Sequence, residues 1–229
     1  PKGEYGKWLR TLPAAIMIDG ALFIHGGVSP DVAGMSVDEI NETVASELKT
    51  FDTARRYLVS QSLVPPAASF TEIADMVVAI TYWADQEDST DIIRRHADLL
   101  EPLVGINEWL TMSPDGPLWF RGATRWDEEI RGEEMAALLD GVGAEVMVVG
   151  HTPDPEGTIR VRFKDRVFLI DTGMLSSYYE GGRPSALEID GDTFTAIYLD
   201  HREVLVGGDE LDKAAELPPG VRELQIASR

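Results

Sequence analysis

The sequence LFIHGGVSP at positions 22–30 has the same plan as VMVVGHTP at positions 146–153. In each, a short apolar run typical of a buried strand is followed by a histidine beside glycine. Loops that follow buried strands commonly carry ligand-binding side chains. We therefore expect two strands that present His25 and His151 at their ends, within reach of one metal ion. Two histidines are too few ligands for a hydrolytic metal site, so further ligands are required.

Each histidine also has a purely structural interpretation. Taken alone, His25 is better explained as a core histidine bonded to backbone than as a ligand, although neutral imidazole is a common metal ligand. The second such strand end, at His151, makes a metal site and a structural role equally well supported. His96 lies in a helical pattern and is expected at the surface, and His201 follows Asp200 at a predicted turn and carries little functional weight.

The surrounding pattern is strands, then helices, then strands. Residues 14–19 and 21–27 are apolar runs around Asp19-Gly20, which predicts a hairpin. Ser36 and Glu39 have the spacing of a capping box, which predicts a helix through about residue 50. Further helices are predicted at 71–85, 91–110 and 133–139, and strands at 145–149, 158–163, 166–170, 185–190, 193–200 and 203–206.

The helical stretch from about 35 to 112 lies between the two segments that carry candidate site residues. An insertion at this place is expected to lie over the site as a cap, and an equally good interpretation is that these helices complete the core. Residues 207–229 are polar and contain adjacent prolines, which predicts a loosely held tail.

The composition restricts the partners of the chain. The 229 residues include 40 Asp and Glu and 20 Lys and Arg, for a net charge of -20. This charge repels nucleic acid and anionic membranes, so neither is expected as a partner. With no cysteine, metal ligands have to come from His, Asp, Glu or Asn. The sequence contains no apolar run that predicts a membrane span and no signal peptide, and it leaves the cytoplasm and the periplasm open as compartments.

Three further positions are candidates for ligand contacts. Arg121 lies in GPLWFRG, and its guanidinium fork matches phosphate oxygens, although a surface ion pair is the alternative and Arg125 competes for the same role. Asp171 follows a predicted strand, where it can orient a ligand histidine or form a turn. Tyr178, in the loop before a glycine pair, can line a pocket or belong to a mobile turn.

Together, HGGVSP, GPLWFRG, VVGHTP and IDTGM followed by GGRPSALEI resemble the C-terminal half of a calcineurin-like metallophosphoesterase. The phosphoprotein phosphatase type is the nearest branch, in particular its bacterial, Shewanella-like members, and the resemblance runs from about residue 5 to 199. It implies an α/β (α+β) fold, a β-sandwich flanked by helices, in which 1–206 form the C-terminal part of the domain, 35–112 a helical insertion, and the N-terminal sheet is incomplete.

The resemblance also implies a reaction and a ligand set. Such enzymes hydrolyse phosphate monoesters with two divalent metal ions, usually manganese, iron or zinc. His25 and His151 correspond to ligands of the second ion, Arg121 to a phosphate clamp and Tyr178 to a substrate contact. Pro153 stands where many members of the wider superfamily have a second histidine, which fits the phosphoprotein phosphatase branch.

The family motifs G-D-x-H, G-D-x-x-D-R-G and G-N-H-E, which supply the other ligands, are absent from the chain. We expect them upstream of Pro1, with an N-terminal segment or a second copy of the chain as partner. The chain alone is then predicted to bind metal weakly and to hydrolyse little. Substrates would be phosphorylated proteins or small phosphoesters. The alternative function is a non-catalytic module that kept the fold and binds a phosphorylated ligand or a protein.

Overall fold

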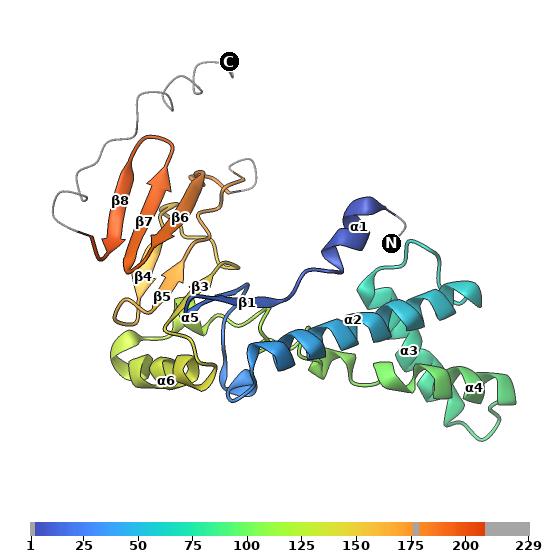
Figure 1. The fold of residues 1–229 in the computed structure, drawn as a ribbon. Coiled ribbons are helices and arrows are strands. Elements are labelled where there is room, and N and C mark those ends of the chain that lie inside the picture. Colours follow the sequence, from blue (N-terminus) through green and yellow to red (C-terminus); the bar gives the residue numbers. More distant parts are fainter. Residues whose placement is uncertain (1–2, 176–178, 209–229) are drawn as a thin grey trace, which may run out of the picture.

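The computed structural model describes residues 3–175 and 179–208, which form two β-sheets with helices beside them (Figure 1). The strands are β1 (Ala15–Ile18), β2 (Ala21–Ile24), β3 (Val146–Val149), β4 (Arg160–Arg162), β5 (Val167–Leu169), β6 (Ser185–Asp190), β7 (Thr193–Tyr198) and β8 (Arg202–Val206). One sheet has the order β1-β2-β3-β5-β4 and the other the order β6-β7-β8. The predicted mixed α/β architecture is confirmed, and the incompleteness of the N-terminal sheet stays a prediction.

Parallel pairing in the larger sheet brings three strand ends to one edge. β1 and β2 form the predicted antiparallel hairpin, whose turn at Asp19 and Gly20 has positive φ at both residues. β2, β3 and β5 then run parallel, with Ile24 opposite Val149 and Val149 opposite Leu169. The loops that follow these three strands therefore leave from the same edge of the sheet.

The larger sheet is covered on both faces, which explains its almost entirely apolar central strands. Val148 and Phe168 point toward the smaller sheet, where Phe168 stacks on Phe194 with ring centroids 4.3 Å apart. Their neighbours Met147 and Val149 point to the opposite face and pack in the core cluster that contains Met135 of helix α6 (Glu128–Gly141). Alternation along a strand thus builds two cores from one sequence run.

The remaining helices are α1 (Glu4–Leu9), α2 (Val37–Ser60), α3 (Phe70–Ala84), α4 (Asp91–Leu100) and α5 (Gly122–Arg125), with 3-10 turns at η1 (Pro30–Val32), η2 (Glu101–Leu103) and η3 (Ile106–Glu108). The predicted capping box is confirmed, because Ser36 accepts from the Glu39 amide while Glu39 accepts from the Ser36 amide. α2 continues ten residues beyond the predicted end near residue 50. The predicted helix 91–110 is wrong after Leu100, where Pro102 lacks an amide donor and 3-10 turns follow.

The helices of the insert have a hydrophobic core of their own. Leu58, Ile73, Val77 and Leu100 belong to this cluster, which contains no residue of either sheet. In Figure 1 the helices α2, α3 and α4 extend away from the two sheets. That the insert covers the site as a cap stays a prediction. Of the predicted tail 207–229, residues 209–229 lie outside the described part of the chain.

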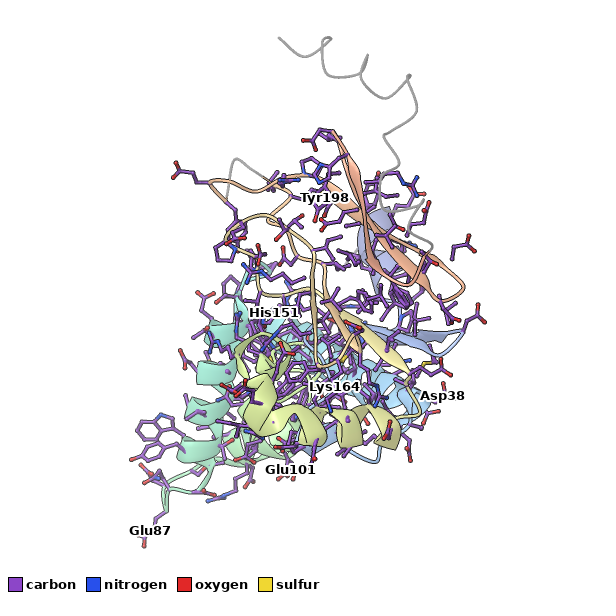
Figure 2. The ribbon with its side chains drawn as sticks, turned by 90° about the vertical axis from the view of Figure 1, so that its left-hand side faces the viewer. Asp38, Glu87, Glu101, His151, Lys164 and Tyr198 are labelled. Carbon is purple, nitrogen blue, oxygen red and sulfur yellow. The ribbon has the colours of Figure 1, made fainter. Side chains whose placement is uncertain are left out.

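No helix in the described residues is both long enough and apolar enough to cross a membrane. The polar and charged side chains are spread over the surface of the sheet region and of the helical insert, as the view turned by 90° shows (Figure 2).

Candidate functional site

The two histidines of the matching sequence runs meet at the shared edge of the larger sheet. His25 directly follows β2, and His151 follows β3 after Gly150, whose amide donates to the His25 carbonyl at 3.0 Å. The His25 Nε2 and His151 Nδ1 atoms lie 3.0 Å apart, and the rings are edge to face with centroids at 4.8 Å. Two segments more than a hundred residues apart in the chain thus direct imidazole nitrogens at each other.

His151 has an uncommon backbone conformation and a partly buried ring. Its φ of 67° lies in the left-handed region, which is uncommon for a non-glycine residue and costs about 1–3 kcal/mol. Its Nε2 atom is buried and has no hydrogen-bond partner among the described residues. Burial first, and then the charges of Arg121 and His25, lower the pKa of His151, against an opposing effect of Asp171. The imidazole is therefore neutral at neutral pH, with a lone pair on one ring nitrogen.

Arg121 lies beside this pair, at the start of α5. Its Nη1 donates to the Thr152 hydroxyl at 2.8 Å, and Trp119 packs edge to face on His151 with centroids 5.4 Å apart. In the described residues, no carboxylate lies within 4.0 Å of the Arg121 guanidinium. This cation is thus placed next to the histidines, and no carboxylate of the described ranges 3–175 and 179–208 pairs with it.

Gly26 explains how the arginine loop reaches the histidines. The Gly26 amide donates to the Pro117 carbonyl at 2.8 Å. A Cβ atom at Gly26 would lie 2.9 Å from the Phe120 amide nitrogen and 3.0 Å from the Pro117 oxygen, both of them backbone atoms. Only glycine lets the segment 117–120 pack this closely against the end of β2. The first glycine of HGG therefore positions the loop that carries Arg121.

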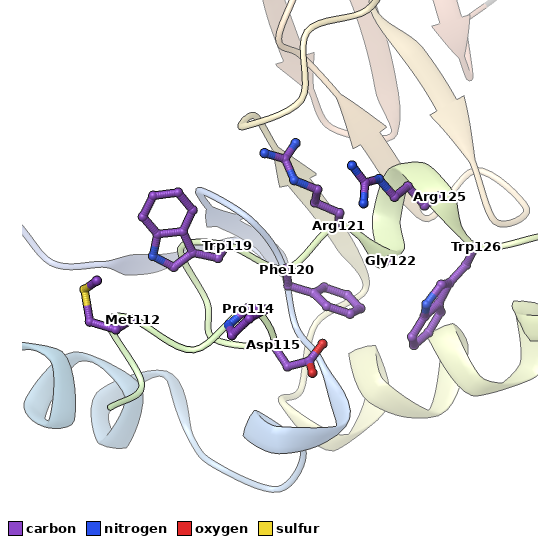
Figure 3. Close-up of a pocket in the computed structure, with 9 residues that line it drawn as sticks. All are labelled: Met112, Pro114, Asp115, Trp119, Phe120, Arg121, Gly122, Arg125 and Trp126. Atoms are coloured by element: carbon purple, nitrogen blue, oxygen red, sulfur yellow. The ribbon is translucent and has the colours of Figure 1, made fainter. Parts of the chain in front are cut away.

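A cavity of about 590 Å³ opens beside this loop (Figure 3). It is lined by Met112, Pro114, Asp115, Trp119, Phe120, Arg121, Gly122, Arg125 and Trp126. Its wall is tied to the insert, because the Glu47 carboxylate of α2 accepts from the amides of Leu110 and Thr111, each at 2.8 Å. Trp119 Nε1 in turn donates to the Thr111 carbonyl at 2.9 Å. The cavity therefore joins elements of the sheet region and of the insert.

Asp171 follows β5 at the same edge, and its structure fits the turn interpretation. Its Oδ1 accepts from the Gly173 amide at 3.1 Å, two residues on, which is a local turn contact. Its negative charge raises the pKa of His151, and this effect is smaller than the lowering by burial, Arg121 and His25. Tyr178 lies outside the described residues, so its predicted substrate contact stays a prediction.

The other two histidines are not part of this arrangement. His96 Nδ1 contacts the Tyr57 hydroxyl at 2.6 Å between α4 and α2, and it is half-buried, not at the surface as predicted. His201 Nδ1 contacts the neighbouring Asp200 carboxylate at 2.9 Å. Both have partners within their own regions of the fold.

The residues at the strand ends fit part of a metal site. Two imidazole nitrogens that each bind an ion at about 2.1 Å lie about 3.0–3.4 Å apart, and Nε2 of His25 and Nδ1 of His151 lie 3.0 Å apart, a distance that also allows a hydrogen bond between the rings. No group of three or more His, Cys, Asp or Glu side chains in the described part of the chain is arranged to hold a metal ion. The pair thus supplies two donors and leaves the other positions to water or to groups outside the described residues.

Sequence reasoning did not assign a role to Thr152, and it did not predict that Trp119, expected beside the Arg121 side chain, contacts His151. Thr152 directly follows the GH pair, and this adjacency is the signal that could have marked it as a neighbour of the site. Trp119 has no such signal, because its contact with His151 depends on how two distant loops pack.

No protein-family model matches the chain. It is 28% identical over 203 residues to Shewanella-like protein phosphatase 1 of Plasmodium berghei (strain Anka), an alignment that covers 87% of this chain and 43% of that protein. It is also 32% identical over 93 residues to an uncharacterized protein of Schizosaccharomyces pombe (strain 972 / ATCC 24843), which covers 40% of this chain and 27% of that protein.

Two of the similar solved structures are of cold-active protein tyrosine phosphatase. One matches with a TM-score of 0.54 and 19% identity over 88% of this chain and 44% of the other. A second, from a psychrophilic Shewanella species, matches with a TM-score of 0.52 and 18% identity over 87% and 45%. The chain therefore has the fold of a part of these phosphatases, and it spans less than half the length of the relatives it matches.

Proposed function

We propose that this chain forms part of a metal-dependent phosphatase site, in which His25 and His151 share one divalent ion and Arg121 binds phosphate oxygens. The observation that carries the proposal is the 3.0 Å approach of the two imidazole nitrogens, at the ends of the parallel neighbouring strands β2 and β3. The similarity to a protein named as a protein phosphatase supports the same reaction class. By resemblance, the complete site would hold two ions, manganese, iron or zinc.

The residues have separate tasks in this proposal. The lowered pKa of His151 keeps its imidazole neutral and available as a ligand. A bound divalent ion would polarise phosphate oxygens as a Lewis acid. The Arg121 guanidinium, steadied by the Thr152 hydroxyl, presents its free N–H groups to the same phosphate. Trp119 packs edge to face on His151 and covers part of that ring.

The proposed substrate is a phosphorylated protein segment. The net charge of -20 disfavours polyanions and favours a neutral or basic peptide around the phosphate, by electrostatics alone. The cavity beside Arg121 is open at the surface and offers room for the residues next to the phosphorylated side chain. A small phosphoester would leave most of it empty.

Metal binding tests the histidine pair. The full chain would be titrated with ZnCl2 and MnCl2 in a calorimeter, and its metal content measured by elemental analysis. We expect weak binding of one ion, which is lost in the His25→Ala, His151→Ala double variant. The matched control is His96→Ala with His201→Ala, which removes two histidines outside the site. Equal binding by both double variants would sink the proposed ligand pair.

A second candidate, a phosphate-binding module without hydrolysis, is favoured by the lack of a third metal-binding side chain near the pair in the described residues. Hydrolysis of p-nitrophenyl phosphate in MnCl2 separates the two. Turnover that disappears in the double histidine variant supports the phosphatase. Phosphopeptide binding that is independent of metal, together with no turnover, supports the binding module.

A further inference from the structure

We propose that Arg125 binds a second acidic group of the substrate, a carboxylate or phosphate close to the phosphate held by Arg121. This inference rests on the proposed function and names its substrate class, an otherwise neutral or basic phosphopeptide with one further acidic group beside the phosphorylated residue, where the two arginines of the cavity locally outweigh the acidic surface. It makes Arg125 a specificity-determining residue of the cavity.

The first argument is the state of the arginines in an acidic chain. Seven arginines of the sheet region and the insert form salt bridges. Each has a carboxylate oxygen within 4.0 Å: Arg10, Arg94, Arg131, Arg160, Arg162, Arg166 and Arg202. Among the described residues, six arginines have none, and two of these, Arg121 and Arg125, line the cavity; the others are Arg55, Arg56, Arg95 and Arg183. Two arginines without acidic partners in one cavity leave a local positive charge that an anionic ligand can neutralise.

The second argument is geometry. Arg121 and Arg125 bracket the short helix α5, and the Arg125 amide donates to the Arg121 carbonyl at 2.9 Å. Side chains four residues apart on a helical turn are neighbours, with Cβ atoms about 5–6 Å apart. Figure 3 shows both guanidinium groups on the same side of the loop, and both residues line the same cavity. Adjacent side chains of an extended peptide span a comparable distance of roughly 3–7 Å.

The other walls leave this position open to a ligand. Asp115 is the acidic residue of the cavity, and in Figure 3 its side chain points away from the two guanidinium groups. The Arg131 guanidinium already stacks on Trp126 at 3.7 Å and pairs with Glu134, so it does not compete for the ligand. Arg125 is exposed and so can reach a group that enters from solvent.

The test compares three peptides of equal length that contain one phosphothreonine. In the first peptide the residue after the phosphothreonine is alanine. In the second peptide this residue is glutamate, and in the third it is phosphoserine. Their affinities for the full chain would be measured by fluorescence anisotropy at constant ionic strength. We expect the two acidic peptides to bind about fivefold tighter than the first, as a solvent-exposed ion pair allows.

Substitutions at Arg125 test whether this residue causes the preference for the acidic peptides. It should vanish in Arg125→Gln, persist in part in Arg125→Lys, and remain in Arg95→Gln, which removes an exposed arginine of the insert with the same change of charge. Circular dichroism would verify the fold, and Arg125→Met replaces Arg125→Gln if the latter is unfolded. A preference that survives the neutral substitution at Arg125, or equal binding of all three peptides, overturns this inference and leaves the proposed function intact. No binding of any peptide overturns both.

Discussion

The sheet region and the helical insert are stabilised in different ways. In the sheets, buried residues alternate between two faces, so that one strand contributes to two cores, and the site residues follow directly where strands end. In the insert, α2 and α3 begin with capping boxes at Ser36 and Ser69, and the apolar faces meet in a separate cluster. The difference teaches that precise placement of reactive groups comes from the strand ends, whereas the insert packs mainly on its own core and joins the sheet core through Ile40 near the start of α2.

The largest expected effect is on the core between the sheets. Phe168 is fully buried and stacks on Phe194, so Phe168→Ala should lower the free energy of unfolding by about 3–5 kcal/mol. Hydrogen exchange would show faster opening in β5 and β7 than in α3, because the insert has its own core. The matched variant Ile73→Ala should reverse this order. Equal loss of protection in both regions after either substitution would show that the two cores unfold as one.

Gly26→Ala should disturb the site more than its small size suggests. The new Cβ would overlap backbone atoms of segment 117–120, so we expect a loss of about 2–3 kcal/mol and a shift of Arg121 away from His151. Calorimetric binding of inorganic phosphate reports the shift. Gly132→Ala in α6 is the control, since no atom lies within 4 Å of its Cβ, and it should stabilise the protein by roughly 0.5–1 kcal/mol. An Arg121 contact unchanged in Gly26→Ala would refute the role of this glycine.

Glu47 links α2 to the segment at the end of the insert that leads to the cavity, and its removal tests this link. Glu47→Ala leaves the amides of Leu110 and Thr111 without their acceptor and should cost about 1.5–2 kcal/mol. Nuclear magnetic resonance should show changes at Thr111 and at the Trp119 indole N–H, which donates to the Thr111 carbonyl. Unchanged indole shifts would mean that the cavity wall is held without the insert.

The smallest effect concerns the capping boxes at acid pH. The Ser36 and Ser69 amides, and then their hydroxyls, lower the pKa of Glu39 and Glu72. A folded-state pKa below the unfolded value means that the stabilisation is complete above the ordinary glutamate pKa of 4.5 and is lost as pH falls below it. Denaturant unfolding of the parent and of Glu39→Gln with Glu72→Gln should therefore differ at pH 6 and converge toward pH 3. A difference that stays constant over this range would contradict the prediction.

Local signals in the sequence predicted local structure well. The hairpin at Asp19-Gly20, the capping box at Ser36 and the apolar strand runs were all identified, because turn chemistry, caps and alternation are properties of short segments. The short helices α1 and α5 were missed, since one or two turns leave almost no periodicity. The extension of α6 back to Glu128 depends on the cap at Asp127, whose carboxylate accepts from two amides.

The candidate site was predictable only where both partners had the same local signal. His25 and His151 each end an apolar run beside glycine, so their meeting followed from parallel pairing. The contact of Arg121 with Thr152 and that of Trp119 with His151 depend on the close packing at Gly26, which no periodicity reveals. Long-range loop contacts of this kind are decided by tertiary packing.

The length of α2 has a mechanical consequence. Its 24 residues span about 36 Å at 1.5 Å per residue, and the helix begins near the sheets and ends inside the core of the insert. Its length would make it a lever arm: a tilt of about 10° around its first turn would sweep its last turn through roughly 6 Å. Glu47 lies near the middle of α2, and its carboxylate binds the amides of Leu110 and Thr111 in the segment that leads to the cavity. The same tilt would therefore displace these two hydrogen bonds by about half as much.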